Sequence, residues 1–280
     1  MDSRKVIIWA NCQGDAIRFI LSRYFSNITN YYNYEFIRNN IPIPKELLEA
    51  DIIIYQNYSS FTETIYNINL ILNSLPIECL KISIPFLQSD IYFPFDNKEH
   101  KNNFKSKNKL KYYGDFYYGI SVINDLIDDE NNINNDEFII NKVFDDNFIK
   151  NDEIEHYFNK NLEYLKNKIL NSNVKKLYQF ILDNYKYVRL FHNRNHPTGI
   201  LLEQLIIEIL NNLNLNHYFS LNDKLVLDNI LKDWIVPILP CVSKYHQLTF
   251  DTNICFSKYD NEIINIESYI KKYILSIKNT

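Results

Sequence analysis

The sequence predicts an α/β fold in which helices flank a mostly parallel sheet, giving three layers with a helical insertion. Three short apolar segments, Val6–Ala10, Asp51–Tyr55 and Leu80–Ile84, have the composition of strands buried on both faces. Segments with apolar residues at helical spacing separate them, and this alternation is typical of parallel α/β sheets. We therefore expect a single domain over residues 1–280, with the insertion at about residues 115–185.

The order of elements follows from the same patterns. A tight loop, Asn11–Gly14, comes after the first strand, and a helix follows it with apolar positions from Ala16 to Tyr24. Glu35–Arg38 is a candidate second strand. The remaining expected elements are helices at Ile65–Leu75, within Ile123–Phe148, at Ile154–Leu170, Leu177–Tyr185 and Gly199–Leu213, and a strand at Tyr187–Phe191.

Composition excludes several classes of protein. Only four glycines occur in 280 residues, and no Gly-rich phosphate-loop motif is present. A net charge of −4 argues against a dedicated nucleic-acid binder. The four cysteines are far apart and form no C-x-x-C pair, so we expect no metal site and no disulfide framework. Neither a leader peptide nor an apolar run of the roughly 18 residues that span a bilayer is recognisable, which indicates a cytoplasmic protein.

The loop after the first strand is the first candidate site. Ligands of open α/β sheets bind at the carboxyl ends of the strands, where helix N-termini favour anions. The field of the helix start would stabilise a thiolate at Cys12, although a small cysteine at a strand end often only packs. Asn11 and Gln13 offer amide donors for a developing oxyanion. Gly14 permits close backbone approach or a positive φ.

The second candidate site is the loop His192–Gly199. Because Pro197 and Thr198 favour a helix start, His196 would lie just before a helix N-terminus. The positive field there disfavours the imidazolium and keeps a neutral base available. Arg194 is suited to pairing with a phosphate or a carboxylate. The alternative is an ordinary loop in which Thr198 caps the helix and His196 is satisfied by local hydrogen bonds.

Both loops resemble motifs of the WcbI-type polysaccharide biosynthesis acetyltransferases. Asn11-Cys12-Gln13 after an apolar strand resembles the opening motif of that family, and Asn195-His196-Pro197-Thr198 resembles its strand–loop–helix element. Weaker similarities lie at residues 85–90, 113–117 and 234–250, so that the resemblance covers about residues 5–250. The chain departs from the family pattern in having Ala10 before the Asn-Cys-Gln and no histidine within residues 85–90.

The resemblance implies an SGNH/Rossmann-like three-layer fold, coenzyme A binding and acetyl transfer to a sugar of a surface glycan. Acetyl-CoA would be the co-substrate, and the acceptor would be the amino or hydroxyl group of a sugar, for example a nucleotide-linked amino sugar. Carried over residue by residue, the catalytic positions are His196, Cys12, Asn11 and Gln13. The candidates for contact with coenzyme A are Gly14, Arg18, Arg194, Asn195 and Thr198, together with the lysines of Lys98–Lys111, which alternatively form a solvated loop.

Two other functions fit the same sequence. An SGNH-like carbohydrate esterase or deacetylase would use the first loop with water as the acceptor. Cysteine in place of serine and the lack of a D-x-x-H pair near the C-terminus argue against it. A non-catalytic module that binds coenzyme A or a glycan would use the surplus of aromatic residues, which more often belong to a core.

Overall fold

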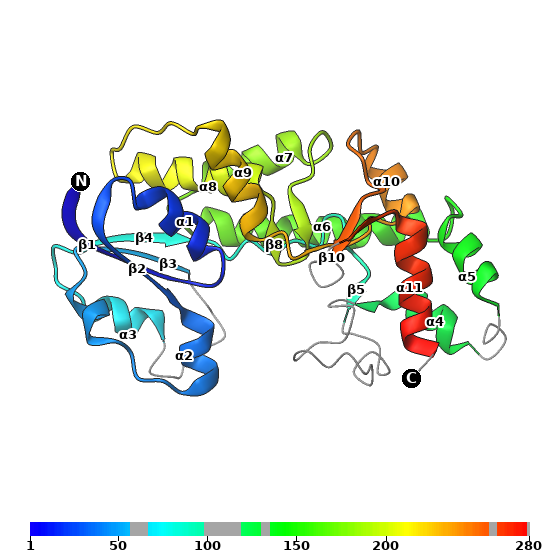
Figure 1. The fold of residues 1–280 in the computed structure, drawn as a ribbon, viewed down its shortest axis with the longest axis horizontal. Helices are drawn as coiled ribbons and strands as arrows, with labels where there is room; N and C mark the ends of the chain where they lie inside the picture. Colours follow the sequence, from blue (N-terminus) through cyan, green and yellow to red (C-terminus); the bar gives the residue numbers. More distant parts are fainter. Residues whose placement is uncertain (57–66, 98–118, 130–134, 258–261, 279–280) are drawn as a thin grey trace. The chain divides into compact units, whose positions relative to one another are not determined.

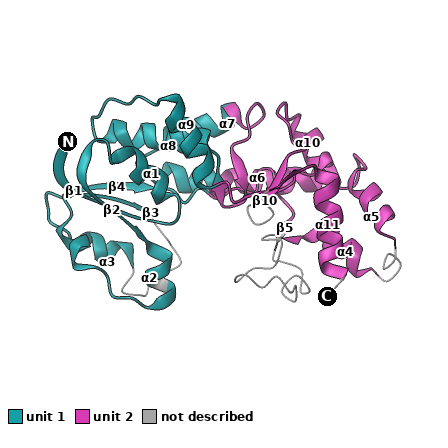
Figure 2. Ribbon diagram, in the orientation of Figure 1, with its two compact units in different colours: residues 1–87, 165–183, 197–231 teal, residues 88–164, 184–196, 232–280 magenta. Residues whose placement is uncertain are grey.

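The computed structural model describes residues 1–56, 67–97, 119–129, 135–257 and 262–278. The chain forms two compact units, each assembled from three segments (Figure 2). Unit 1 comprises residues 1–87, 165–183 and 197–231, and unit 2 comprises residues 88–164, 184–196 and 232–280. The sequence predicts one domain with an insertion at residues 115–185, and the residues of that expected insertion are shared between the two units.

Unit 1 contains a four-stranded parallel sheet in the order β2-β1-β3-β4, which confirms the predicted α/β class. The strands are β1 (Asp2–Ala10), β2 (Phe25–Tyr32), β3 (Ile52–Gln56) and β4 (Leu80–Ile84). From β1 the chain adds β2 on one side and then crosses to add β3 on the other. The strand order therefore reverses between β1 and β3, and a ligand crevice is expected at the carboxyl ends of these two strands.

Helices cover both faces of this sheet (Figure 1). One face carries α1 (Gly14–Leu21), α8 (Gly199–Asn212) and α9 (Leu221–Ile230), and the other carries α2 (Asn33–Asn39) and α3 (Ile68–Asn73). Ile7 and Trp9 belong to the core cluster under α2 and α3. Side chains alternate along a strand, so Val6, Ile8 and Ala10 point to the opposite face. Burial on both faces explains why this strand is a continuous apolar run.

A close helix contact in unit 1 requires Gly199. A Cβ atom at this position would lie 2.5 Å from the backbone nitrogen of Asp228 in α9. Because the neighbouring atom belongs to the backbone, it has little freedom to move aside. Glycine therefore allows the first turn of α8 to pack directly against α9.

Unit 2 is built from helices and small sheets. Its helices are α4 (Ser121–Asp128), α5 (Asp136–Val143), the first part of α6 (Asn151–Leu170), α10 (Pro240–His246) and α11 (Ile266–Lys278). Its strands are β5 (Asp96–Asn97), β6 (Gly119–Ile120), β7 (Phe191–Asn193), β9 (Trp234–Ile235), β10 (Cys255–Ser257) and β11 (Glu262–Ile264). The short strand β8 (His196–Pro197) pairs with β7, and the division of the chain into the two units falls between its two residues.

The Arg189 guanidinium holds the chain around β7 in place. It donates hydrogen bonds to the carbonyl oxygens of Phe191, His192, Val236 and Ile254. Burial lowers the pKa of Arg189 to about 10, which still leaves the group charged at neutral pH. One cation thus orders three separate segments that approach the His192–Gly199 loop.

Most predicted elements are confirmed, including the strands of the first half and the helices α1, α3, α6, α7 (Lys176–Asn184) and α8. The predicted strand Glu35–Arg38 is wrong, because this segment lies in helix α2 and the second strand is Phe25–Tyr32. That strand lies at the edge of the sheet and is mostly half-exposed, so its polar residues hide the buried-strand pattern. The strand expected at Tyr187–Phe191 begins only at Phe191. Residues 98–111 and 113–117 lie outside the described residues.

Candidate functional site

The loop Asn11–Gly14, here called the Cys12 loop, lies at the carboxyl end of β1 in unit 1. The backbone nitrogen of Asn11 donates to Oε1 of Gln56, the last residue of β3, at 2.8 Å. This hydrogen bond joins the ends of the two strands between which the sheet order reverses. The Cys12 loop therefore occupies the position at which open α/β sheets bind their ligands.

Gln13 fixes the loop from inside the unit. Its side chain is fully buried, and Nε2 donates to the Leu87 carbonyl oxygen at 2.9 Å. Its Oε1 accepts from the Leu87 backbone nitrogen and from Nε2 of Gln56, each at 3.2 Å. These hydrogen bonds engage the Gln13 amide on both sides. Its geometry suits a positioning residue for the loop.

Asn11 presents its amide differently. Its Oδ1 accepts from the backbone nitrogen of Gln13 at 3.0 Å, which fixes the side-chain plane. No hydrogen bond engages Nδ2 within the part of the chain that the structure describes. Asn11 thus has an oriented N–H donor beside Cys12, whose side chain is partly exposed. A thiol and an amide donor next to each other are suited to acyl chemistry.

The start of α1 is anchored through Asp15. The carboxylate accepts a hydrogen bond from Nδ2 of Asn30 at 3.0 Å and one from the Tyr32 hydroxyl. Burial and the Asp15 carboxylate raise the pKa of Tyr32, so Tyr32 stays a donor at all ordinary pH values. Gly14 packs against Asn30, since a Cβ atom would lie 2.3 Å from its Oδ1. The alternative of a positive φ at Gly14 is wrong, because no glycine described in the structure has one.

The candidates for contact with coenzyme A in unit 1 have different surroundings. Arg18 lies one turn into α1, and its side chain is exposed. Thr198 is buried at the N-cap of α8, but its side chain makes no capping hydrogen bond. The expected start of this helix at Gly199 is confirmed.

In unit 2, Asn193 shapes the loop that carries His196. Its Nδ2 donates to the Trp234 carbonyl oxygen at 3.0 Å. Its Oδ1 accepts from the backbone nitrogens of Asn195 and His196, at 3.0 and 3.1 Å. Asn193 is 1% exposed, so the turn is fixed from its buried side. The side chains of Asn195 and His196 are half-buried.

Arg194 pairs with a carboxylate of its own unit. Its Nε lies 2.7 Å from Oδ1 of Asp90, and its carbonyl oxygen accepts from the Ser89 backbone nitrogen at 2.8 Å. Burial raises the pKa of Asp90, and the Arg194 guanidinium opposes that rise. The sequence predicts a phosphate or carboxylate partner for Arg194, and the partner found is Asp90.

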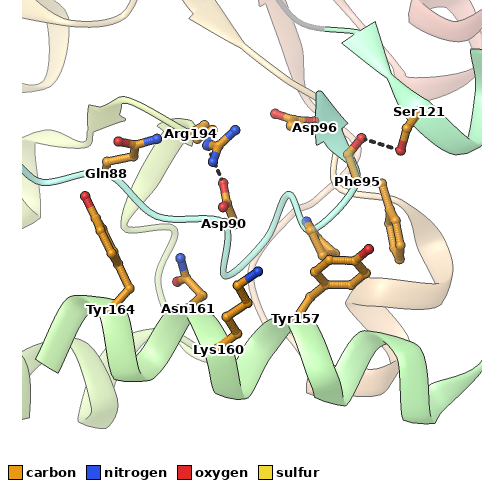
Figure 3. Close-up of a pocket in the computed structure, with 11 residues that line it drawn as sticks. Gln88, Asp90, Phe95, Asp96, Ser121, Tyr157, Lys160, Asn161, Tyr164 and Arg194 are labelled. Atoms are coloured by element: carbon orange, nitrogen blue, oxygen red, sulfur yellow. Dashed lines mark hydrogen bonds and ion pairs between the residues drawn. The ribbon is translucent and has the colours of Figure 1, made fainter. Parts of the chain in front are cut away.

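A cavity of about 390 Å³ lies next to this ion pair. We call it the unit 2 cavity. Figure 3 shows four side chains that reach it from one face of α6, at helical spacing i, i+3, i+4 and i+7. Those side chains are Tyr157, Lys160, Asn161 and Tyr164. Opposite them lie the Asp90–Arg194 pair and Asp96 (Figure 3).

Asp96 is the unusual group of this cavity. Its Oδ2 is buried and has no hydrogen-bond partner within the described part of the chain. Burial raises the pKa of Asp96 well above its usual range, and the nearby Asp90 carboxylate adds to the effect. A buried carboxyl oxygen without a donor is costly, and such groups are common where a ligand supplies the missing donor.

The sequence reasoning missed Asp96 and the polar face of α6. Two signals were present: Asp90 and Asp96 flank an aromatic run, and the i, i+3, i+4, i+7 face of α6 is aromatic and polar instead of apolar.

Cys12 belongs to unit 1 and His196 to unit 2. Within the described ranges, no group of three or more His, Cys, Asp or Glu side chains could hold a metal ion. The helices of these ranges include none that is both long and apolar enough to cross a membrane.

Comparisons with known proteins identify a family and a solved structure to which this chain is similar. A family model described as the polysaccharide biosynthesis enzyme WcbI matches residues 5–218. A solved structure of WcbI, described as a polysaccharide biosynthesis enzyme in its native form without a disulfide bond between coenzyme A and a cysteine, is also similar. The two share 14% sequence identity and a TM-score of 0.70, over 100% of this chain and 91% of that one. At this identity the structural likeness concerns the fold. A search of curated proteins finds no match.

Proposed function

The chain belongs to the WcbI family of polysaccharide biosynthesis enzymes, and we propose that it is an acetyl-CoA-dependent acetyltransferase that modifies a sugar. The observation that carries the proposal is the Cys12 loop at the switch point of the parallel sheet, with Nδ2 of Asn11 available as a donor. The solved relative supports it, since its description concerns coenzyme A and a cysteine. A cytoplasmic site of action is part of this proposal.

In the proposed reaction, a sugar hydroxyl or amine attacks the thioester carbonyl carbon of acetyl-CoA. His196 accepts the proton of the attacking group as the new bond to carbon forms. Nδ2 of Asn11 donates to the carbonyl oxygen, which becomes negative in the tetrahedral intermediate. The carbon–sulfur bond then breaks, and the leaving thiolate of coenzyme A takes the proton from the His196 imidazolium. Gln13 contributes by holding the loop in place.

We propose direct transfer to the sugar, with Cys12 lining the acyl-donor site. A covalent acetyl-cysteine would require the loop thiol to exchange with the thioester before the acceptor reacts. Cys12→Ala separates the two routes, because direct transfer retains activity and a covalent route loses it. Accumulation of an acetylated enzyme in the absence of acceptor, detected by intact mass, would contradict direct transfer.

Coenzyme A carries several phosphate charges, which require cations. Arg18 is exposed one turn into α1 and is the candidate closest in sequence to the Cys12 loop. Arg194 is a weaker candidate, because Asp90 already neutralises its guanidinium. The residues Gly14, Asn195 and Thr198 remain candidates for backbone or side-chain contacts to the same molecule.

Two measurements test the proposal. Thermal unfolding with coenzyme A, acetyl-CoA and simple sugars shows a rise in Tm with coenzyme A if the nucleotide binds the native state. His196→Ala lowers turnover about 10²- to 10⁴-fold, the usual contribution of a general base, and leaves the coenzyme A shift intact. His217→Ala, at an exposed histidine of unit 1, serves as the matched control and keeps full turnover. No shift with millimolar coenzyme A, or full activity of His196→Ala, contradicts the proposal.

A further inference from the structure

We propose that the unit 2 cavity binds the sugar acceptor as an uncharged pyranose ring, recognised through its hydroxyl groups. The role of acceptor rests on the proposed transferase function. The presence of a sugar site rests on the cavity alone. Its lining combines exposed aromatic rings with carboxyl, amide and guanidinium groups, all contributed by unit 2.

The size of the cavity suits a single sugar residue. Its volume of about 390 Å³ lies near the lower end of the range of small-molecule sites, roughly 300–1,000 Å³. A ligand as long as coenzyme A would fill it only in part. The cavity is therefore better matched to the acceptor than to the acyl donor.

Aromatic side chains provide flat apolar surface for the ring. Tyr157 is 38% exposed and Tyr164 is 37% exposed, although both line the cavity. Tyr157 contacts Phe95 edge-on, with ring centroids 5.5 Å apart, which holds its ring in a fixed orientation. The C–H face of a pyranose is apolar and packs on such rings. This arrangement explains why large aromatic residues occur on a solvent-exposed face of α6.

The polar groups match hydroxyls, which both donate and accept hydrogen bonds. Oδ2 of Asp96 is buried and has no hydrogen-bond partner among the described residues, so an O–H group of a ligand would satisfy it. Ser89 donates to Oδ1 of Asn161 at 2.9 Å, which orients the Asn161 amide. Among the described residues no acceptor engages its Nδ2, which is therefore a donor for a ligand. The Asp90–Arg194 pair adds an acceptor and several donors.

Charge selects against ionised sugars. Asp90 and Asp96 balance Arg194 and Lys160, so the described lining carries no net charge when all four are ionised. Protonation of Asp96 would leave an excess of one positive charge, which repels an ammonium group. An anionic sugar would meet the Asp90 carboxylate, whose partner Arg194 is already paired with it, and the remaining cation of the described lining, Lys160, is exposed to solvent. A neutral ring avoids both costs, and the proposal therefore favours transfer to a hydroxyl group.

Saturation-transfer difference NMR with the full chain tests this inference. The probes are the methyl pyranosides of glucose, galactose and mannose, compared with glucosamine and glucuronate at equal millimolar concentration. We expect signals from the neutral glycosides that exceed those from the charged sugars. Tyr157→Ala and Asp96→Asn should each weaken neutral-glycoside binding about tenfold, through loss of ring packing and of one hydrogen bond respectively.

Tyr187→Ala is the matched control, because Tyr187 is a 63% exposed tyrosine of unit 2 that does not line the cavity. It should leave the signals unchanged. Coenzyme A binding is measured on the same samples by thermal shift. Glycoside binding without a coenzyme A shift would support the sugar site and contradict the transferase. A coenzyme A shift without neutral-glycoside binding, stronger binding of glucosamine or glucuronate, or binding unaffected in both variants would overturn the cavity proposal.

Discussion

Asp223 in unit 1 and Asp96 in unit 2 both have buried carboxyl oxygens. Within the described residues, hydrogen bonds engage both oxygens of Asp223 but leave Oδ2 of Asp96 without a partner. Asp223 is 1% exposed, accepts from the Ser220 backbone nitrogen at the start of α9 and pairs with Arg23 of unit 1. Its pKa is lowered, chiefly by the Arg23 hydrogen bonds. Asp96 has an oxygen that no donor reaches in the described ranges, and burial raises its pKa.

This difference in hydrogen bonding distinguishes two kinds of buried polar group: those that stabilise the fold and those that are available to a ligand. Gln13 belongs with Asp223, because the hydrogen bonds of its amide fix the Cys12 loop from within. Asn161 belongs with Asp96, because in the part of the chain that the structure describes a hydrogen bond engages its Oδ1 and none engages its Nδ2. If this division is correct, substitutions in the first group destabilise the protein and substitutions in the second do not.

The largest effect is expected for Gln13→Leu. The substitution leaves the buried N–H and carbonyl groups of Leu87 without their partner and removes one acceptor for Gln56. Each unsatisfied buried group costs about 1–3 kcal/mol, so the free energy of unfolding should fall by about 3 kcal/mol or more. Urea denaturation followed by circular dichroism measures this change.

Gln88→Leu is the control for that experiment. Gln88 adjoins Leu87 in the chain, is half-exposed and lines the unit 2 cavity. A substitution there should change the free energy of unfolding by less than about 1 kcal/mol. Equal losses in the two variants would show that the two regions do not differ in the way proposed.

A smaller loss is expected for Asp223→Asn. The amide keeps a side-chain oxygen for capping α9 but loses the charge that pairs with Arg23, at a cost of about 2 kcal/mol at neutral pH. A carboxyl group whose pKa is lowered by folding stabilises the native state at pH values above its pKa in the unfolded chain. This stabilisation is lost as the pH falls through its pKa in the folded protein. The difference between parent and variant should therefore shrink as the pH approaches 3. A difference that stays constant with pH would exclude the ion pair as its source.

The sheet and the Cys12 loop could be predicted from sequence because their signals are local. The runs at Ile7–Ala10 and Ile52–Ile54 are apolar since both faces of the strands are covered, and a strand–loop–helix unit defines where a ligand binds. The hydrogen bonds by which Gln13 positions the Cys12 loop could not be predicted in the same way. Its partner Leu87 is 74 positions away, and an amide that donates to a ligand looks the same in sequence as one that donates to the backbone.

The sequence contains separate signals for the unit 2 cavity, but they could not be combined into a site because its parts are distant in the chain. Asp90, Asp96, α6 and Arg194 come from three segments between residues 88 and 194, and no local pattern links them. The aromatic positions of α6 also match those of a helix that buries tyrosines in a core. Only their exposure in the folded chain distinguishes the two cases.

The smallest expected effect has the opposite sign and is that of Asp96→Asn. A carboxyl group whose pKa is raised by folding destabilises the native state above its folded pKa, and this cost disappears as pH falls below the unfolded value near 4. Asparagine has no charge to bury, so the free energy of unfolding at pH 7 should rise by on the order of 1 kcal/mol. The gain should diminish towards pH 4. Its sign is opposite to that of the Asp223→Asn effect, which is a loss of stability at neutral pH. Asp90, Arg194 and Arg189 act on Asp96 electrostatically and are unchanged in the variant, which isolates the carboxyl group as the cause. Thermal unfolding of parent and both variants between pH 3 and pH 8 checks both predictions. A lower stability of Asp96→Asn at pH 7 would mean that Asp96 is a structural group like Asp223, because a residue retained for a ligand costs stability in the ligand's absence.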